Sequence, residues 1–465
     1  MELRLSSLLL LLSLLFLIVC LSQFCKGTVP NSMSQETDQE QYEVEGGITF
    51  WSWKYTMKSI ESELEGFQGA YPGISVNTVL LSHDDAYKKF LLANAANQGA
   101  PDVATLSGYY IGQYIETNAL EDLTELIAPY RDRIVDSKWP DAIKDGRIYA
   151  MPWDSGPVAL FYRRDVFEQA GFPSDPESVS ELVSTWDKYV EVGKQIKART
   201  GVAMHTMALD SAVGMTRILE HMMAQQGTLY VDNEGKIAIN GPEALRALKL
   251  LIELKRENLL LDAEVGSEPW QQAMNEGKVA TTLDPVWMGG TLRDIAKDSE
   301  GLWGVVKMPA WVEGGPRAAE GGGSYFGISK QSTNKEAAWA FIEYMLGNAD
   351  TVNRIHRVAD VFPSLKEAYE NPMYDEPQPF FAGQVTGRLF VELSKESEPV
   401  YFSNDFKVAR EIAVLEMYKA MKGYITPEAA LREMERKMQE KTKREIRSKE
   451  GSWPHEDTQT MVDAQ

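Results

Sequence analysis

Residues 146–171, GRIYAMPWDSGPVALFYRRDVFEQAG, join two groups of alternating strand and helix patterns in the sequence. We interpret the stretch as a strand that would cross from one folded part to another, followed by the start of a helix. A crossing strand of this kind would hold a hinge and form the floor of a cleft. We therefore expect two lobes that meet at this segment.

The group before this stretch predicts an α/β lobe. Residues 48–51 are an apolar run typical of a buried strand, and Met57, Ile60, Leu64 and Phe67 recur on one face of a following helix. The next elements are expected at residues 74–79 (strand), 85–96 (helix), 101–106 (strand) and 110–119 (helix). Strands that alternate with helices in this way predict a largely parallel sheet covered on both faces.

The group after Asp154 predicts a second α/β lobe. Thr185 is placed to cap one helix and Pro242 to open another. Later helices are expected to begin near residues 333–334 and at Thr426. The final residues from Ser448 are polar and are expected to fray.

Length and charge limit the class of protein. The chain has 465 residues, so it exceeds the size at which single cores usually stop growing, and two domains are expected. Its formal net charge is -21, and the part after residue 27 carries -22 because Glu2, Arg4 and Lys26 sum to +1. Such a chain repels nucleic acid, anionic lipid surfaces and acidic ligands. A neutral ligand fits best, and the 11 tryptophans suit the faces of pyranose rings as well as they suit a core.

The N-terminal residues predict an export signal. Arg4 precedes an apolar run from Leu8 to Leu21, and residues 26–28 follow as a polar turn. Residues 1–27 therefore predict a cleaved signal peptide, a lipoprotein signal or an uncleaved membrane anchor. We expect the membrane to be contacted only through this segment. The protein should then act in the periplasm or on the extracellular face of the cytoplasmic membrane.

The two cysteines, Cys20 and Cys25, both lie inside this leader. Val19 and Phe24 precede them, whereas a lipoprotein signal places a small residue before the modified cysteine. Cleavage near Gly27 would leave no cysteine, which excludes disulfides, thiolate metal sites and a cysteine nucleophile. The polar residues 28–45 are expected to be a flexible spacer, and residues 448–465 a polar tail.

Motifs for catalysis or for cofactors are missing from the sequence. The five histidines are scattered, with no pair at the spacing of a zinc-binding helix, and we expect no metal. There is no phosphate loop that ends in Lys-Ser/Thr and no Gly-x-Ser-x-Gly elbow, so no cofactor and no catalytic residue is predicted. The enzyme alternative is a glycoside hydrolase, which needs only two carboxylates at a fixed separation. The alternating strand and helix pattern argues against a glycoside hydrolase, because it gives no run of eight matching βα units.

The stretch 146–171 resembles the signature of the family 1 extracellular solute-binding proteins, the maltose-binding-protein-like sugar receptors of bacterial ABC importers. Other blocks agree with this family in the same order: residues 50–53, 100–103, 185–187, 276–280, 284–287, 322–325 and 362–363. The resemblance covers residues 47 to about 440. Arg163 departs from it, because Asn or Asp commonly follows the tyrosine, and we expect Arg163 to alter the mouth of the cleft.

The resemblance implies a two-lobed type II periplasmic-binding fold of the α/β class, with lobes joined by crossing hinge strands. One lobe would comprise residues 46–157 and 325–366, and the other residues 158–324 and 367–447. Ligand binds at the carboxyl ends of the strands, as it does in open α/β sheets generally. The candidate ligand-binding residues are Trp51, Trp53, Tyr109, Tyr110, Asp154, Asp210, Asp284, Trp287, Gly323, Ser324 and Tyr325. Of these, Trp287 and Asp154 suit a sugar best, as a stacking face and an acceptor of hydroxyl hydrogens.

The predicted function is capture of a neutral sugar or small oligosaccharide by closure of the two lobes, followed by delivery to the membrane subunits of an ABC permease. No covalent step is needed, so the chain is predicted not to be an enzyme. A solute receptor that feeds a sensor system would have the same folded body and stays open as an alternative. The resemblance implies a monomer.

Overall fold

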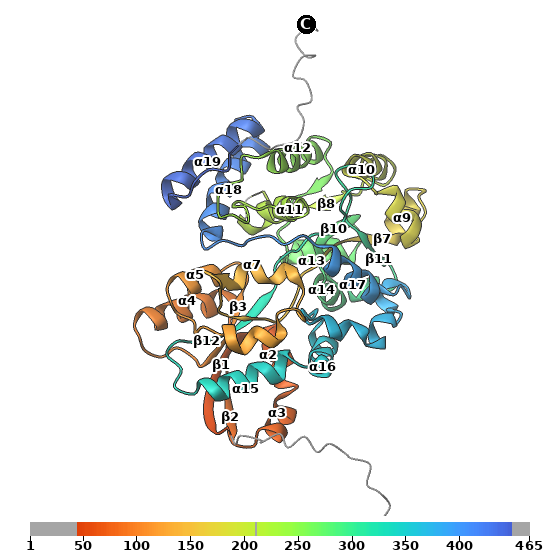
Figure 1. The fold of residues 1–465 in the computed structure, drawn as a ribbon. Helices are drawn as coiled ribbons and strands as arrows, with labels where there is room; N and C mark the ends of the chain where they lie inside the picture. Colours follow the sequence, from red (N-terminus) through yellow and green to blue (C-terminus); the bar gives the residue numbers. More distant parts are fainter. Residues whose placement is uncertain (1–43, 210–211, 449–465) are drawn as a thin grey trace, which may run out of the picture. The chain divides into compact units, whose positions relative to one another are not determined.

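The computed structural model describes residues 44–209 and 212–448, which contain two main sheets with helices packed around them (Figure 1). The predicted leader at residues 1–27 lies outside the described residues, and so do most of the predicted spacer and tail and the candidate residue Asp210. The described residues from Val44 to Ser448 belong to one compact unit. No helix in the described ranges is both long enough and apolar enough to cross a membrane.

The first sheet has five strands in the order β2-β1-β3-β12-β6. Its strands are β1 (Gly46–Trp53), β2 (Ile74–Leu81), β3 (Val103–Ser107), β6 (Met151–Pro152) and β12 (Ser324–Ile328). The strands β1, β2 and β3 are parallel, as the alternating pattern predicted, whereas β12 runs antiparallel to both β3 and β6. Because β1 and β3 are parallel, their carboxyl ends meet at one edge of the sheet.

The single helix predicted through Met57 and Phe67 is wrong, because the chain forms two helices there, α2 (Lys54–Glu61) and α3 (Leu64–Ala70). Between them the hydroxyl of Ser62 donates to the carbonyl of Ser59, and Glu63 turns inward to an ion pair with Arg354. The apolar spacing still marks the buried side, since Met57 and Phe67 are both in the core.

The second sheet has three strands in the order β10-β7-β11, and both neighbours run antiparallel to β7. These are β7 (Val158–Arg163), β10 (Thr281–Pro285) and β11 (Trp303–Lys307). Every residue of β7 is buried. Its alternate side chains enter two different hydrophobic clusters, with Phe161 in one and Leu160 in the other. This is the period of two that a strand imposes.

The remaining helices and short strands cover these sheets. The α-helices are α4 (His83–Ala95), α5 (Ile111–Glu116), α6 (Thr124–Ile127), α7 (Trp139–Ala142), α8 (Arg164–Gln169), α9 (Pro176–Leu182), α10 (Trp186–Thr200), α11 (Ala212–Ala224), α12 (Pro242–Arg256), α13 (Glu268–Asn275), α14 (Met288–Ile295), α15 (Lys335–Leu346), α16 (Ala349–Ala359), α17 (Thr386–Glu396), α18 (Phe406–Met421) and α19 (Pro427–Thr442). The short strands are β4 (Ile143–Lys144), β5 (Arg147–Ile148), β8 (His205–Thr206) and β9 (Leu260–Leu261), and the 3-10 helices are η1 (Ala128–Tyr130), η2 (Asp136–Lys138), η3 (Lys297–Ser299), η4 (Lys366–Glu370), η5 (Pro372–Asp375) and η6 (Pro379–Phe381).

Several helices begin where capping residues predicted them. The hydroxyl of Thr185 accepts from the backbone N–H of Lys188 at the start of α10, and Thr426 caps α19 in the same way. Pro242 is the first residue of α12. Proline fits this position because the first helical N–H has no partner within the helix.

Two segments connect the first sheet to the second. Residues 153–157 lead from β6 to β7, and residues 308–323 lead from β11 back to β12. Each sheet with its helices forms one lobe, and these segments are the crossings between the lobes. Arg163, expected at the mouth of the cleft, is instead buried, and it donates to the carbonyl of Met274 and to the carboxylate of Asp165. The residue boundaries of the lobes stay a prediction.

Candidate functional site

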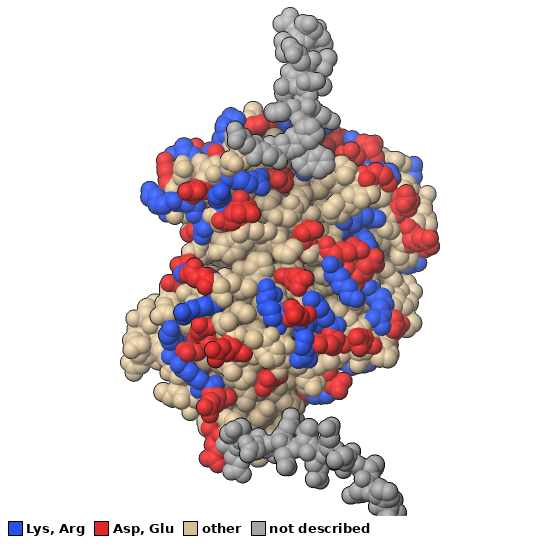
Figure 2. All heavy atoms as spheres, viewed as in Figure 1, with Lys and Arg blue, Asp and Glu red and all other residues tan. Residues whose placement is uncertain are grey.

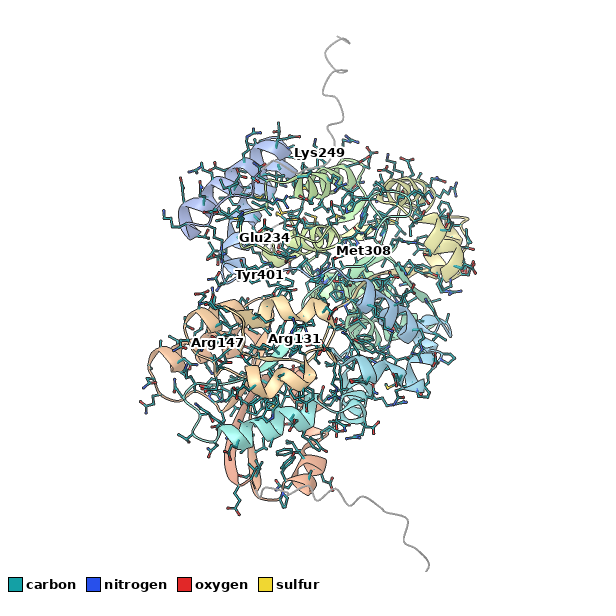
Figure 3. The ribbon with its side chains drawn as sticks, viewed as in Figure 1. Arg131, Arg147, Glu234, Lys249, Met308 and Tyr401 are labelled. Atoms are coloured by element: carbon teal, nitrogen blue, oxygen red, sulfur yellow. The ribbon has the colours of Figure 1, made fainter. Side chains whose placement is uncertain are left out.

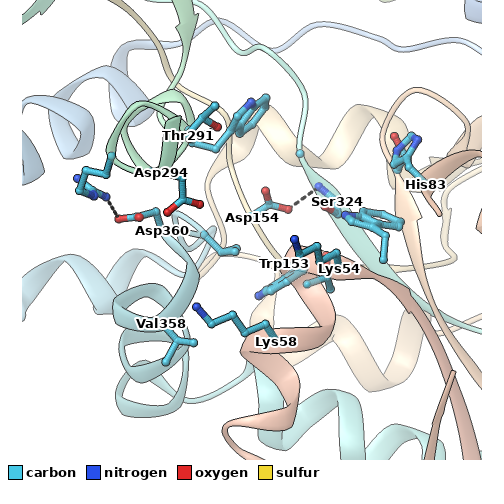
Figure 4. A pocket seen from close by; sticks show the side chains of 18 of the residues that line it. Lys54, Lys58, His83, Trp153, Asp154, Thr291, Asp294, Ser324, Val358 and Asp360 are labelled. Atoms are coloured by element: carbon cyan, nitrogen blue, oxygen red, sulfur yellow. Dashed lines mark hydrogen bonds and ion pairs between the residues drawn. The ribbon is translucent and has the colours of Figure 1, made fainter. Parts of the chain in front are cut away.

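A cavity of about 670 Å³ lies where the carboxyl ends of β1 and β3 face α14 and the end of α16 (Figure 4). Its size is within the usual range for a small-molecule site. The residues that line it are Trp53, Lys54, Thr56, Lys58, His83, Ser107, Tyr109, Trp153, Asp154, Trp287, Gly290, Thr291, Arg293, Asp294, Gly323, Ser324, Val358, Asp360 and Val361. This places the cavity at the strand ends where ligands bind in open α/β sheets.

Both crossings supply the floor of the cavity. The backbone N–H of Ser324 donates to Asp154 Oδ1 over 2.6 Å, and the N–H of Trp153 donates to the carbonyl of Ser324 over 2.9 Å (Figure 4). Gly323 has a φ of +122°, and a Cβ there would lie 2.4 Å from the carbonyl oxygen of Asp154. Only glycine permits this conformation and this approach.

Asp154 is a buried carboxylate beside the cavity. Burial raises its pKa, while the nearby Lys138 ammonium and the hydrogen bonds from Ser324 act in the opposite direction. One of its oxygens is held by the Ser324 N–H, so the carboxylate is oriented before any ligand arrives. A fixed carboxylate of this kind accepts hydrogen bonds from ligand hydroxyl groups.

Trp287 and α14 form one wall. A Cβ on Gly156 would lie 2.7 Å from the indole ring of Trp287, so glycine at the crossing makes room for this ring. The next turns of α14 bring Thr291 and Asp294 to the cavity. The wall therefore combines an aromatic face with hydroxyl and carboxylate groups, the combination that holds a sugar ring.

The opposite wall follows β1. Trp53, at the end of this strand, meets the ring of His83 edge to face with 4.8 Å between centroids. Burial lowers the pKa of His83, although Asp84 raises it in part. Lys54 and Lys58 lie one helical turn apart on α2 and line the same side (Figure 4).

Tyr109 lines the cavity, but much of its ring is occupied. It stacks on Phe406 of α18 with 5.3 Å between ring centroids. The guanidinium of Arg410, on the same helix, lies 4.8 Å from the centroid of the Tyr109 ring. Its hydroxyl donates to the carbonyl of Gly321 over 3.0 Å. Tyr109 follows a strand of the first sheet and packs on a helix of the second lobe, so it bridges the lobes as well as lining the cavity.

Six of the predicted residues line the cavity together: Trp53, Tyr109, Asp154, Trp287, Gly323 and Ser324. Four others lie away from it. Trp51 packs at the edge of the core and Tyr110 stacks on Tyr87. Asp284 is fully buried in an ion pair with Arg217, and Tyr325 is fully buried with its hydroxyl bonded to Asp141. Asp210 lies outside the described residues, so its role stays a prediction.

The structure adds residues that the sequence reasoning missed, among them Lys58, His83, Trp153, Asp294 and Asp360. Trp153 was within reach of that reasoning, because it directly precedes Asp154 in the crossing stretch. Asp294 could also have been predicted, since it lies two helical turns after Trp287 in the sequence. No sequence pattern predicted Asp360, because its position depends on how the end of α16 packs beside α14. There Asp360 forms an ion pair with Arg293.

The charges that line the cavity balance. Three basic side chains, Lys54, Lys58 and Arg293, are matched by three aspartates, Asp154, Asp294 and Asp360. On the face shown in Figure 2, acidic and basic side chains are likewise interspersed. Within residues 44–209 and 212–448, no group of three His, Cys, Asp or Glu side chains is placed to hold a metal ion.

Comparison with curated proteins finds sugar-binding relatives over most of the chain. The arabinooligosaccharide-binding protein of Bacillus subtilis is 27% identical over 416 residues, which cover 86% of this chain and 91% of that protein. The lactose-binding protein of Rhizobium radiobacter is 29% identical over 361 residues, covering 75% of this chain and 82% of that protein.

Solved structures confirm the predicted two-lobed α/β fold. An extracellular solute-binding protein of family 1 superposes with a TM-score of 0.74 at 22% identity and covers 85% of this chain and 99% of its own. The ABC transporter associated binding protein of B. animalis subsp. lactis Bl-04, solved with β-1,6-galactobiose, gives a TM-score of 0.71 at 27% identity and covers 86% of this chain and 98% of its own.

A family model described as bacterial extracellular solute-binding protein matches residues 51–352, which is more than half of the chain. The match spans both crossings and most of the residues that line the cavity. Proteins of this family bind substrates and are not enzymes, so the prediction of binding without catalysis is confirmed and the glycoside hydrolase alternative is set aside. The chain belongs to the bacterial extracellular solute-binding protein family.

Proposed function

We propose that this protein captures a sugar or small oligosaccharide between its two lobes and delivers it to the membrane subunits of an ABC permease. The observation that carries the proposal is the cavity itself, in which Trp53 and Trp287 offer apolar faces and Asp154 offers a held carboxylate. Pyranose rings bind through their CH-rich faces and through bidentate hydrogen bonds from their hydroxyl groups.

The relatives support a carbohydrate of more than one unit. Those described above are named for arabinooligosaccharides and lactose, and the Bl-04 protein was solved with a disaccharide. A cavity of about 670 Å³ has room for a ligand of this class. Closure of the lobes around it requires no chemical step, because ligand contacts from both lobes favour the closed state.

The proposed ligand is electrically neutral. Three basic and three acidic side chains line the cavity, so its formal charge is zero when all six are ionised. The chain as a whole carries a net charge of -21, which would repel an anionic ligand at a distance. An acidic sugar would therefore need a surplus of cations that the cavity does not offer.

The proposed location is outside the cytoplasmic membrane, in the periplasm or on the extracellular face, with the protein as a monomer. The support for export is the leader at residues 1–27, whose apolar run from Leu8 to Leu21 is preceded by Arg4. The polar residues 28–45 would act as a tether between that segment and the folded body.

A thermal-shift screen tests the proposed ligand class. The panel contains arabinotriose, lactose, maltotriose and β-1,6-galactobiose, with glucuronic acid and amino acids as controls. A ligand at 100 times its dissociation constant adds about 2.7 kcal/mol of stability, so a true ligand raises the melting temperature clearly. The bound sugar should be recovered intact by mass spectrometry.

Three results would contradict the proposal. A shift with amino acids alone would indicate a different class of solute, and a shift with glucuronate alone would contradict the neutral ligand. Cleavage of the sugar would restore the hydrolase alternative. For the delivery step, the sugar-loaded protein should recover the permease subunits in a pull-down. Recovery of sensor-kinase subunits in place of the permease subunits would contradict delivery to a transporter.

A further inference from the structure

A cluster of four charged side chains lies behind the floor of the cavity. It consists of Lys138, Asp141, Asp154 and Glu320, none of which is more than 8% exposed. Only Asp154 reaches the cavity. Charged groups are rarely buried unless they are paired, so the arrangement of the other three calls for a physical reason.

Glu320 ties the two crossings to each other. It belongs to the second crossing, yet its Oε1 accepts from the backbone N–H of Gly156 over 2.7 Å, and its Oε2 accepts from the hydroxyl of Ser155 over 2.8 Å. Both of these partners belong to the first crossing. Rotation of one lobe against the other must change backbone torsions in these segments, so it must also strain or break these bonds.

Lys138 fastens the second crossing to the first lobe. Its ammonium donates to the carbonyl of Gly322 over 2.6 Å and lies 3.8 Å from Glu320 Oε1. The same ammonium lies 4.9 Å from the centroid of the Tyr325 ring, at the start of β12. Lys138 thus holds the crossing from the end of η2, on the side away from the ligand.

Asp141 brings in a third segment. Its Oδ1 accepts from the backbone N–H of Phe402 over 2.8 Å, and its Oδ2 accepts from the hydroxyl of Tyr325 over 2.9 Å. Phe402 directly follows Tyr401, which is labelled in Figure 3, and it precedes α18, with which it shares a hydrophobic cluster of the second lobe. The carboxylate on α7 is therefore a direct hydrogen-bonded link between the lobes.

The cluster has one cation and three carboxyl groups, so it would carry a charge of minus two if all four were ionised. Burial raises the pKa of Asp141 to about 7, against the lowering effect of Lys138 and of the hydrogen bonds from Phe402 and Tyr325, and the charge of Glu320 raises it further. The titratable and charged groups that face Asp141 are Lys138, Glu320, Tyr325 and Tyr401, and Asp154 faces the same Lys138 ammonium.

We propose that Lys138 and Asp141 are positioning residues that lock the angle between the lobes, and that the lock loosens as the pH rises through neutrality. The lock acts on ligand affinity through the crossings, although neither side chain lines the cavity. With Asp141 protonated the buried cluster has the smaller net charge, and the three segments stay bonded. With Asp141 ionised, the added buried charge favours a wider lobe angle that admits water to the cluster.

Small-angle X-ray scattering on the full-length protein without sugar tests the lock directly. The radius of gyration should increase between pH 5.5 and pH 8.5, with a midpoint near the pKa of Asp141. This measurement needs no ligand, so its result is independent of whether the proposed sugar function is right. A radius of gyration that does not change over this range would overturn the proposal.

Two variants and a matched control separate the lock from a general loss of stability. D141N should abolish the transition, and E320Q should move it to lower pH, because the charge of Glu320 raises the pKa of Asp141. The control is E416Q, since Glu416 is equally buried but pairs with Lys419 and Lys437 within the second lobe. E416Q should keep the wild-type transition.

The affinity for the best sugar of the thermal-shift panel follows the same profile. The apparent dissociation constant of the sugar rises about twofold each time the fraction of protein molecules in the binding-competent lobe arrangement is halved. Binding should therefore weaken with rising pH in the wild type but not in D141N. Circular dichroism checks that each variant is folded, and E320Q carries the test if D141N does not fold. A transition that persists unchanged in folded D141N or E320Q would refute the assignment of the lock to this cluster.

Discussion

Trp287 and Asp154 differ in how firmly the protein holds them. The Asp154 carboxylate is bonded to the backbone of Ser324, whereas the indole of Trp287 rests against Gly156 and remains partly exposed at the cavity. A ligand can therefore cover the free part of the indole ring and meet a carboxylate that is already oriented. Stacking should supply binding energy, and the carboxylate should supply selection among hydroxyl positions.

Trp287→Ala should weaken sugar binding by about 1 to 3 kcal/mol, because it removes the stacking face while leaving the crossings intact. Isothermal titration with the sugar found in the thermal-shift screen measures this loss. Trp339→Ala is the matched control, since Trp339 is a half-buried tryptophan on α15 that does not line the cavity. Equal affinity of the Trp287 variant and the wild type would remove Trp287 from the site.

At the scale of elements, the crossings decide how the site is built. The crossing before β7 carries Gly156 and the crossing before β12 carries Gly323, and each glycine lies where a side chain would collide with its surroundings. These close approaches bring Trp287 to one side of the floor and Asp154 to its centre. The two crossings thus act as a scaffold for the ligand site and as the place where the lobes bend.

Gly156→Ala should lower both stability and sugar affinity, by about 1 to 3 kcal/mol in stability, since the new methyl group would lie 2.7 Å from the Trp287 ring and force it to move. Thermal unfolding and titration of the same preparation give both quantities. Gly69→Ala on the exposed side of α3 is the control, because a Cβ there meets nothing within 4 Å. Helix propensity makes that control equal to or slightly more stable than the wild type. A Gly156→Ala variant with wild-type affinity would show that the ring position is not set by this contact.

At the scale of the whole molecule, buried histidines should limit stability in acid. Burial and the nearby Arg217 lower the pKa of both His205 and His221 to about 3, well below that of an exposed imidazole. The unfolded chain therefore binds more protons than the native state between about pH 6.5 and pH 3. The stability that these neutral rings contribute is present above pH 6.5 and is lost as the pH falls through this window.

Each histidine should make the free energy of unfolding fall by up to about 1.4 kcal/mol per pH unit in that window. A variant that carries both His205→Asn and His221→Gln should have a flatter dependence of melting temperature on pH than the wild type. His455, which lies in the polar tail, provides the control as His455→Gln. If the double variant follows the wild-type profile between pH 6.5 and pH 4, these rings are not the acid-sensitive groups.

Much of this molecule follows from local patterns in the sequence. Alternating apolar runs and capping residues such as Thr185 and Pro242 predicted the α/β class, and the stretch 146–171 predicted both the family and the crossing that forms the floor of the cavity. These features depend on neighbours within a few residues, because strand and helix periods and helix caps are local properties.

Tertiary structure decided which side chains reach the ligand. Trp51 and Trp53 share one face of β1, but only Trp53 stands at the carboxyl end, so only Trp53 lines the cavity. Asp360 meets Arg293 only because α16 ends beside α14, and the raised pKa of Asp141 arises from burial among groups that are distant in the sequence. Proximity and burial of this kind depend on how the whole chain packs, which no local pattern of residues contains.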